Sequence, residues 1–197
     1  MLAALGVFIR QSFVPAQICA SWRLAIESAP AELAQVYTRD GVTADVQQDV
    51  RRALSVNLAR DAAAPIERAL DDLRGEVSAH FREPLASREP PHYLVYGPGA
   101  FFAPHRDRPR VATTAPEAAA RKVSVVLFVN GPRDIDPDGY VGGALNFYGL
   151  IDDPRCRDIG LGCDAAPGLL VAFRSDTLHE VTPVVEGRRV TVVTWFA

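Results

Sequence analysis

The sequence predicts an α+β fold that is mainly β, in which helices of the first half support a sandwich or barrel of short strands. Before residue 90, apolar residues recur three or four positions apart, which is typical of amphipathic helices. After residue 90, apolar runs become short and rich in Val and Phe, and Gly, Pro and Asp interrupt them, as in strands. We therefore expect a single domain over residues 1–197, with a helical support region at 1–90 and a β core at 91–197.

The support region contains two segments with clear helical periodicity. Ala16–Ala29 follows a proline, which suits the start of a helix, and Pro65–Phe81 carries its apolar residues on one face. Met1–Ile9 is apolar, but it lacks a basic start and is too short to cross a bilayer, so it predicts a strand and not a signal peptide. Residues 42–63 have no firm assignment, and Asp49–Leu58 within them fits either a helix or irregular chain.

Seven short strands are expected in the β core. Two loops beside them, Arg108–Ala120 and Arg157–Gly168, are expected to be mobile and to flank the functional site, because loops beside a rigid sheet usually carry substrate selection. The expected strands are Tyr93–Tyr96, Phe101–His105, Val123–Val129, Ala144–Tyr148, Leu169–Phe173, Glu180–Val184 and Val190–Phe196.

The bulk composition is that of a soluble globular enzyme. Of the 197 residues, 48% are hydrophobic and 23% are charged, and the net charge is -3 at pH 7. This balance gives no global positive field, so we expect neither nucleic acid nor a membrane as a partner. The three cysteines form no disulfide framework, which indicates a reducing compartment and a cytoplasmic protein. Cys156 and Cys163 are expected to be free thiols rather than a metal or redox pair.

His105-Arg106-Asp107 is the central motif. Residues two apart in a strand point to the same side, so His105 and Asp107 face one point while Arg106 faces away. His179, at the start of a later strand, is the best third ligand. Two imidazoles and one carboxylate are the ligand set of non-haem Fe(II) oxygenases, and they leave positions on the metal for a 2-oxo acid and O2. An isolated His-x-Asp pair also occurs on many surface strands, so the case depends on further residues.

A co-substrate with a distal carboxylate needs a cation deep in the barrel, and the planar guanidinium of Arg binds a carboxylate through two hydrogen bonds. Glu186-Gly187 predicts the turn before the last strand, which then begins at Arg188 or Arg189. Side chains alternate along a strand, and we expect Arg189 to point inward. The alternative is that both arginines are solvated charges at the strand end. The residues that share the inward face are Arg189, Thr191, Val193 and Trp195.

Several segments can be compared with a known family. They run Tyr96-Gly-Pro-Gly-Ala-Phe-Phe-Ala-Pro-His105-Arg-Asp107, Arg121-Lys-Val-Ser-Val-Val-Leu-Phe-Val-Asn130, Gly142-Gly143-Ala-Leu-Asn-Phe-Tyr148, His179-Glu-Val-Thr-Pro-Val, and Arg189 with Trp195 six residues later. Over roughly Tyr93–Ala197, this pattern resembles the catalytic domain of prolyl 4-hydroxylases, within the superfamily of Fe(II)- and 2-oxoglutarate-dependent dioxygenases. Residues 108–121 and 131–140 depart from the family pattern, so prolyl specificity is not carried over.

The resemblance implies a double-stranded β-helix, or jelly roll, with iron at its open end. It implies a hydroxylase that uses Fe(II), 2-oxoglutarate and O2, is supported by ascorbate as a reductant, and releases succinate and CO2. The implied substrate is an amino acid, a peptide or protein, or a natural-product intermediate. The implied iron ligands are His105, Asp107 and His179. The implied 2-oxoglutarate site consists of Arg189 as the anchor of the distal carboxylate, Tyr96 as a hydroxyl donor to the same group, and Leu127, Thr191 and Val193 as lining residues.

Other functions fit parts of the pattern. Nucleic-acid demethylases of the same superfamily usually carry a second Arg six residues after the anchor, where this sequence has Trp195. A non-catalytic metal-binding or sensor domain on a jelly roll leaves the anchoring Arg unexplained. A zinc hydrolase with the same three ligands leaves both Arg189 and Tyr96 without a role. The acidic stretch 134–139 imitates the start of an EF-hand loop, but the twelfth position is Leu145, so we expect a solvated hairpin loop.

Overall fold

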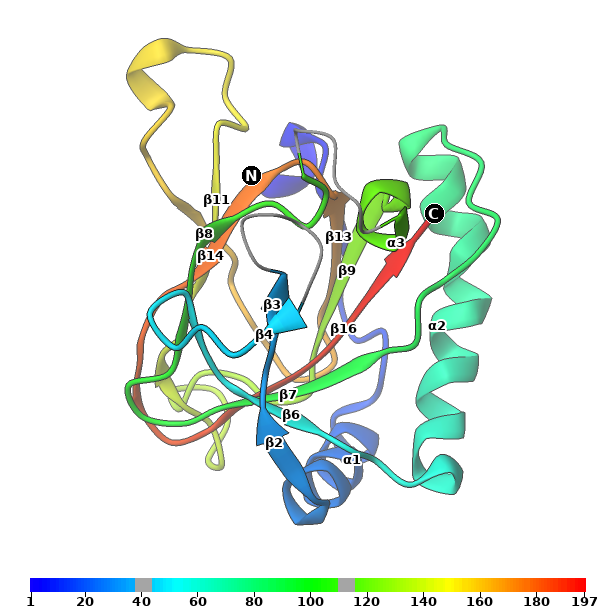
Figure 1. The fold of residues 1–197 in the computed structure, drawn as a ribbon, viewed down its shortest axis with the longest axis vertical. Helices are drawn as coiled ribbons and strands as arrows, with labels where there is room; N and C mark the ends of the chain where they lie inside the picture. Colours follow the sequence, from blue (N-terminus) through cyan, green and yellow to red (C-terminus); the bar gives the residue numbers. More distant parts are fainter. Residues whose placement is uncertain (38–43, 110–115) are drawn as a thin grey trace.

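The computed structural model describes residues 1–37, 44–109 and 116–197, and two antiparallel sheets form its centre (Figure 1). Phe147 of one sheet meets Phe173 of the other with ring centroids 5.0 Å apart, so the sheets pack face to face. The larger sheet contains, in spatial order, β1 (Phe8–Arg10), β13 (Leu170–Arg174), β9 (Val123–Phe128), β16 (Arg189–Phe196), β7 (His92–Tyr96), β6 (Leu54–Val56) and β2 (Ala31–Leu33). The smaller sheet contains β12 (Leu161–Gly162), β11 (Leu145–Tyr148), β14 (Leu178–Val181), β8 (Phe101–His105) and β5 (Arg51–Arg52). Two short pairs join β10 (Val141–Gly142) to β15 (Val184–Glu186) and β3 (Val36–Tyr37) to β4 (Ala44–Asp45).

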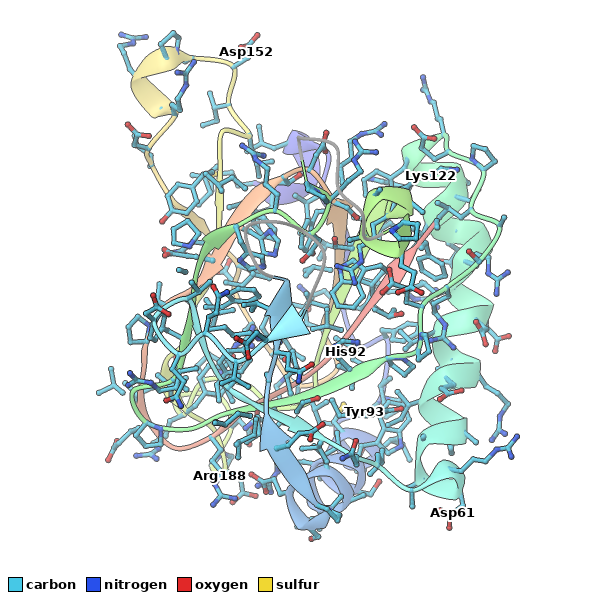
Figure 2. All side chains as sticks on the ribbon, viewed as in Figure 1. Asp61, His92, Tyr93, Lys122, Asp152 and Arg188 are labelled. Atoms are coloured by element: carbon cyan, nitrogen blue, oxygen red, sulfur yellow. The ribbon has the colours of Figure 1, made fainter. Side chains whose placement is uncertain are left out.

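Helices α1 (Ala16–Ser28) and α2 (Arg60–Phe81) cover the outer face of the larger sheet. The apolar side chains of α2 recur three or four positions apart and are buried against β9 and β16 in the main core. Each fully buried Leu or Ile contributes about 1.5–3 kcal/mol to the stability of this layer. Side chains fill the layer between α2 and the sheet (Figure 2). The remaining helical segments are α3 (Pro116–Ala120) and the 3-10 turns η1 (Leu2–Leu5) and η2 (Pro154–Cys156).

The mainly β fold with helices on one face confirms the expected fold class. The helix predicted from Pro65 begins a turn earlier, at Arg60, and Ala63 in the added turn is buried with the rest of its face. At Asp49–Leu58 the helix alternative is wrong, and the irregular chain of the other alternative is interrupted by two short strands. β5 and β6 lie there and pair with β8 and β7, which are distant in the sequence, so local periodicity carries no signal for them.

Three smaller differences concern the ends of elements. The strand predicted within Met1–Ile9 is confined to β1, because η1 precedes it. The strand predicted at Glu180–Val184 is divided into β14 and β15 around Pro183, which has no N–H to donate to a ladder. Part of the loop predicted at Arg108–Ala120 is the short helix α3, and residues 110–115 lie outside the described part of the chain. Across the residues that the structure describes, no helix combines the length and apolar character needed to span a membrane.

Candidate active site

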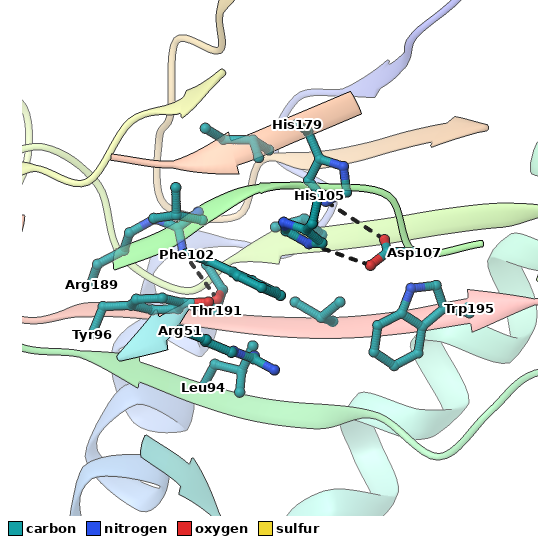
Figure 3. Close-up of a pocket in the computed structure, with 14 residues that line it drawn as sticks. Arg51, Leu94, Tyr96, Phe102, His105, Asp107, His179, Arg189, Thr191 and Trp195 are labelled. Atoms are coloured by element: carbon teal, nitrogen blue, oxygen red, sulfur yellow. Dashed lines mark hydrogen bonds and ion pairs between the residues drawn. The ribbon is translucent and has the colours of Figure 1, made fainter. Parts of the chain in front are cut away.

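Two neighbouring strands of the smaller sheet bring a metal-ligating triad together. In the pairing of β14 with β8, His179 lies opposite His105, and Asp107 follows β8 in a bend. Asp107 Oδ1 lies 3.6 Å from His105 Nε2, and its Oδ2 lies 3.6 Å from His179 Nε2 (Figure 3). All three ligand atoms lie within 4.8 Å of one another. Ligand atoms about 2.1 Å from one ion lie roughly 3–3.5 Å apart, so small side-chain movements suffice to hold one metal ion.

The protonation states of the triad also suit a metal. His105 Nδ1 lies 2.8 Å from the Ala103 carbonyl and His179 Nδ1 lies 3.0 Å from the Thr177 carbonyl, so each Nδ1 is placed to donate and each Nε2 is the nitrogen that faces Asp107. Burial and repulsion from His105 lower the pKa of His179 to about 4. Burial alone raises the pKa of Asp107, but the charge of His179 and the hydrogen bond and charge of His105 hold it well below its ordinary value. At neutral pH the site therefore offers a carboxylate and a neutral imidazole, as metal binding requires.

A pocket opens beside the triad between the two sheets, with about 440 Å³ of empty space that is partly open to solvent. Its walls are mainly apolar, and the side chains of two arginines, Arg51 and Arg189, also line it (Figure 3). The residues that line it are Arg51, Leu94, Tyr96, Phe102, His105, Asp107, Val126, Leu145, His179, Val181, Arg189, Thr191, Val193 and Trp195.

Arg189 lies at the inner end of this pocket and is only 1% exposed. Its Nη1 donates to Thr191 Oγ1 at 3.3 Å, while its Nε is buried without a hydrogen-bond partner. The guanidinium carbon lies 5.2 Å from the ring centroid of Tyr96 and 5.1 Å from that of Phe128. A buried guanidinium with an unused donor is costly unless an anion meets it, so this end of the pocket fits a carboxylate.

The strand alternation expected for the last strand is present in β16. Arg189, Thr191, Val193 and Trp195 all line the pocket. Arg188 is exposed at the periphery of the molecule (Figure 2). Tyr96 of β7 lies opposite Arg189 in the strand pairing and is buried in the pocket wall.

Leu127 does not line the pocket, which corrects the sequence-based expectation. It lies on the other face of β9 and is fully buried in the core beneath the helices, together with Leu70 and Leu73 of α2. Its neighbour Val126 is the β9 residue that faces the pocket. The sequence interpretation did not assign Leu94, Val126, Leu145, Val181 or Arg51 to the site. Arg51 is the charged residue among them, and it lies in the stretch that had no firm assignment.

Comparison with known proteins adds independent findings. The family described as the 2OG-Fe(II) oxygenase superfamily matches residues 91–197. A PKHD-type hydroxylase from Sphingopyxis alaskensis is 33% identical over 107 residues, which cover 54% of this chain and 43% of that protein. A PKHD-type hydroxylase from Synechococcus elongatus is 27% identical over 183 residues, which cover 93% of this chain and 66% of that protein. The chain therefore spans between about two fifths and two thirds of the length of these curated relatives.

Solved structures show the same architecture. A prolyl-4-hydroxylase from Pseudomonas putida superposes with a TM-score of 0.70 at 25% identity, over 99% of this chain and 94% of that one. A prolyl hydroxylase from Trichoplax adhaerens, in complex with a hypoxia inducible factor peptide fragment, superposes with a TM-score of 0.74 at 18% identity, over 99% of this chain and 84% of that one. These likenesses confirm the expected double-stranded β-helix.

Proposed function

Because this chain belongs to the 2OG-Fe(II) oxygenase superfamily, we propose that it is an Fe(II)- and 2-oxoglutarate-dependent hydroxylase with iron held by His105, Asp107 and His179. One observation carries the proposal. The three candidate ligands converge at one end of a pocket whose other end holds the buried, incompletely paired guanidinium of Arg189. A metal site alone needs no such cation, whereas a co-substrate with a 2-oxo group and a distal carboxylate needs both.

The residues of the chain have separate roles in this reaction. Bound Fe(II) supplies O2 activation coupled to the conversion of 2-oxoglutarate to succinate and CO2, with one oxygen atom passing to the substrate. Arg189 binds the distal carboxylate, Thr191 holds the guanidinium in place, and the Tyr96 hydroxyl donates to the same carboxylate. Val193 and the other apolar walls exclude water from the co-substrate.

The substrate class follows from the relatives only in outline. They are named PKHD-type hydroxylases and prolyl hydroxylases, and one was solved with a peptide. We therefore include a peptidyl substrate beside free amino acids and natural-product intermediates. Ascorbate as a supporting reductant, a cytoplasmic location and a single catalytic domain over residues 1–197 belong to the same proposal.

The decisive measurement is an anaerobic visible spectrum of the purified protein with Fe(II), before and after addition of 2-oxoglutarate. Wild type is compared with Arg189→Ala and with the exposed neighbour Arg188→Ala, which loses the same charge. We expect a weak charge-transfer band in wild type and Arg188→Ala, and its loss or strong weakening in Arg189→Ala. The absence of any band in folded, iron-loaded wild type would exclude the proposed function.

A further inference from the structure

A second arginine, Arg51, lines the same pocket beside Phe102 (Figure 3). It belongs to the edge strand β5, where the pairing with β8 sets it opposite Phe102. Its guanidinium carbon lies 4.7 Å from the Phe102 ring centroid, and the Phe102 ring is stacked on His105 with centroids 3.4 Å apart. Arg51 is therefore separated from a candidate iron ligand by a single aromatic ring.

Among the residues that the structure describes, the buried guanidinium of Arg51 meets no carboxylate. The residue is 8% exposed, its Nε is buried without a hydrogen-bond partner, and Nη1 donates a long bond of 3.3 Å to the Gln35 carbonyl. Within residues 1–37, 44–109 and 116–197, no carboxylate forms an ion pair with it. Arg121, at another edge of the site, is by contrast paired with both oxygens of Glu89. A buried charge without a partner is unfavourable, and the described part of the chain supplies none, so an anion bound in the pocket is the natural complement of Arg51.

The charges of the loaded site leave Arg51 unmatched. The two positive charges of Fe(II) balance the two negative charges of 2-oxoglutarate, and Arg189 balances Asp107. Arg51 is then the remaining charge among the described residues that line the pocket. The positive charge of Arg51 also acts on His92, which packs on Trp195. Burial lowers the pKa of His92, and the positive charges of Arg51 and Arg121 lower it further.

We propose that Arg51 binds a carboxylate of the primary substrate, so that the molecule hydroxylated here is an anion. The assignment rests on the proposed function, because it presupposes that Arg189 is occupied by the co-substrate. The carboxylate can come from two sources, the α-carboxylate of a free amino acid or the side chain of Asp or Glu in a peptide. Both present the same planar group to a guanidinium.

The test uses matched acidic and neutral probes on the anaerobic protein loaded with Fe(II) and 2-oxoglutarate. One arm compares the free L-amino acids with their carboxamides. The other compares N-acetylated, C-amidated peptides that contain Glu with the same peptides containing Gln. Dissociation constants are measured by ligand-observed NMR for wild type, Arg51→Gln, Arg51→Lys and Arg52→Gln. Arg52 is the matched control, because it is the exposed neighbour on β5 and lies outside the pocket.

In at least one arm, we expect acids to bind wild type roughly 10- to 100-fold more tightly than their neutral partners, as for a charged hydrogen bond. This preference should disappear in Arg51→Gln, persist in Arg52→Gln and be partly retained in Arg51→Lys; the responding arm identifies the source of the carboxylate. Equal binding of acids and neutral partners, or no anionic probe whose binding depends on Arg51, overturns the proposal. So does loss of the 2-oxoglutarate band in a folded Arg51→Gln protein, since Arg51 then serves the co-substrate. Failure of the proposed function is distinguishable from failure of this proposal, because in that case the wild-type protein itself lacks the 2-oxoglutarate charge-transfer band.

Discussion

Arg121 donates from Nε and Nη2 to the two carboxylate oxygens of Glu89, at 2.6 and 2.7 Å. The same guanidinium lies 3.8 Å from the ring centroid of Trp195, and its Nη1 donates to the main-chain oxygen of Asp107 at 3.3 Å. Glu89 and Arg121 therefore connect Asp107, a candidate iron ligand, to Trp195 of β16. They act on the site through the position of Asp107 and not by touching the metal.

Replacing Glu89 by Gln should lower both stability and metal affinity. The variant removes the carboxylate that pairs with a largely buried guanidinium, so we expect the free energy of unfolding to fall by about 1–3 kcal/mol. Fe(II) affinity should fall several-fold, because the backbone at Asp107 is less firmly held. Chemical denaturation and anaerobic Fe(II) titration measure the two effects. Glu83→Gln is the control, because its ion pair with Arg174 is exposed and contributes about 0–1 kcal/mol. Equal losses in both variants would contradict the proposed link to Asp107.

Removal of a triad residue should abolish metal binding. Asp107→Ala and His179→Ala each leave two ligands, and loss of even an outer partner of a ligand costs about 10–100-fold in affinity, so we expect weakening beyond 100-fold. Co(II) absorption titration of the folded variants provides the measurement. Asp176→Ala is a suitable control, since Asp176 lies close in sequence but pairs with Arg108 outside the triad. A folded Asp107→Ala protein with wild-type metal affinity would remove the triad from the proposal.

Much of the site could be anticipated from local rules. The two-residue spacing of His105 and Asp107, and the alternation that separates Arg188 from Arg189, are properties of an extended chain and need no knowledge of the fold. The structure buries Arg189 and exposes Arg188 as expected. It also brings His105 and Asp107 together, but through the bend that follows β8, because the strand ends at His105. His179 was only the best candidate for the third ligand until the family resemblance supported it, because the two strands that carry the histidines are far apart in the sequence.

The errors have a physical cause in the environment of the strands. β9 is buried along its whole length, because helices cover one face and the smaller sheet covers the other. Such a strand is a continuous apolar run, so alternation could not test the position of Leu127 that the family resemblance implied, and Leu127 lies on the other face. Arg51 lies in a strand of two residues that exists through its pairing with Phe102 and its neighbours, and no local pattern predicts it.

Substitution of Leu127 should lower stability alone, and substitution of Thr191 should lower 2-oxoglutarate affinity alone. Leu127→Ala removes a fully buried side chain from the core beneath the helices, so the free energy of unfolding should fall by about 2–5 kcal/mol. Its 2-oxoglutarate affinity should remain that of wild type. Thr191→Val conserves shape but removes the oxygen that accepts from Arg189, so 2-oxoglutarate affinity should fall roughly 3- to 10-fold with little change in stability. Thermal unfolding measures stability, and titration of the charge-transfer band measures 2-oxoglutarate affinity. A Leu127→Ala protein that is as stable as wild type but binds 2-oxoglutarate weakly would indicate that Leu127 lines the pocket after all.

Gly143 should be intolerant of a side chain because it supports Arg189. Its φ is +61°, and an added Cβ would lie 2.9 Å from Val184 Cγ2 and 3.0 Å from Arg189 Cδ. Gly143→Ala should therefore lose about 1–3 kcal/mol from backbone strain and also weaken 2-oxoglutarate binding by moving the guanidinium. Gly149→Ala is matched to it, since its φ is +66° and nothing lies within 4 Å of the added Cβ. We expect similar strain but wild-type 2-oxoglutarate affinity in that control. If both variants bind 2-oxoglutarate like wild type, backbone strain alone accounts for the loss of stability, and the position of Arg189 does not depend on Gly143.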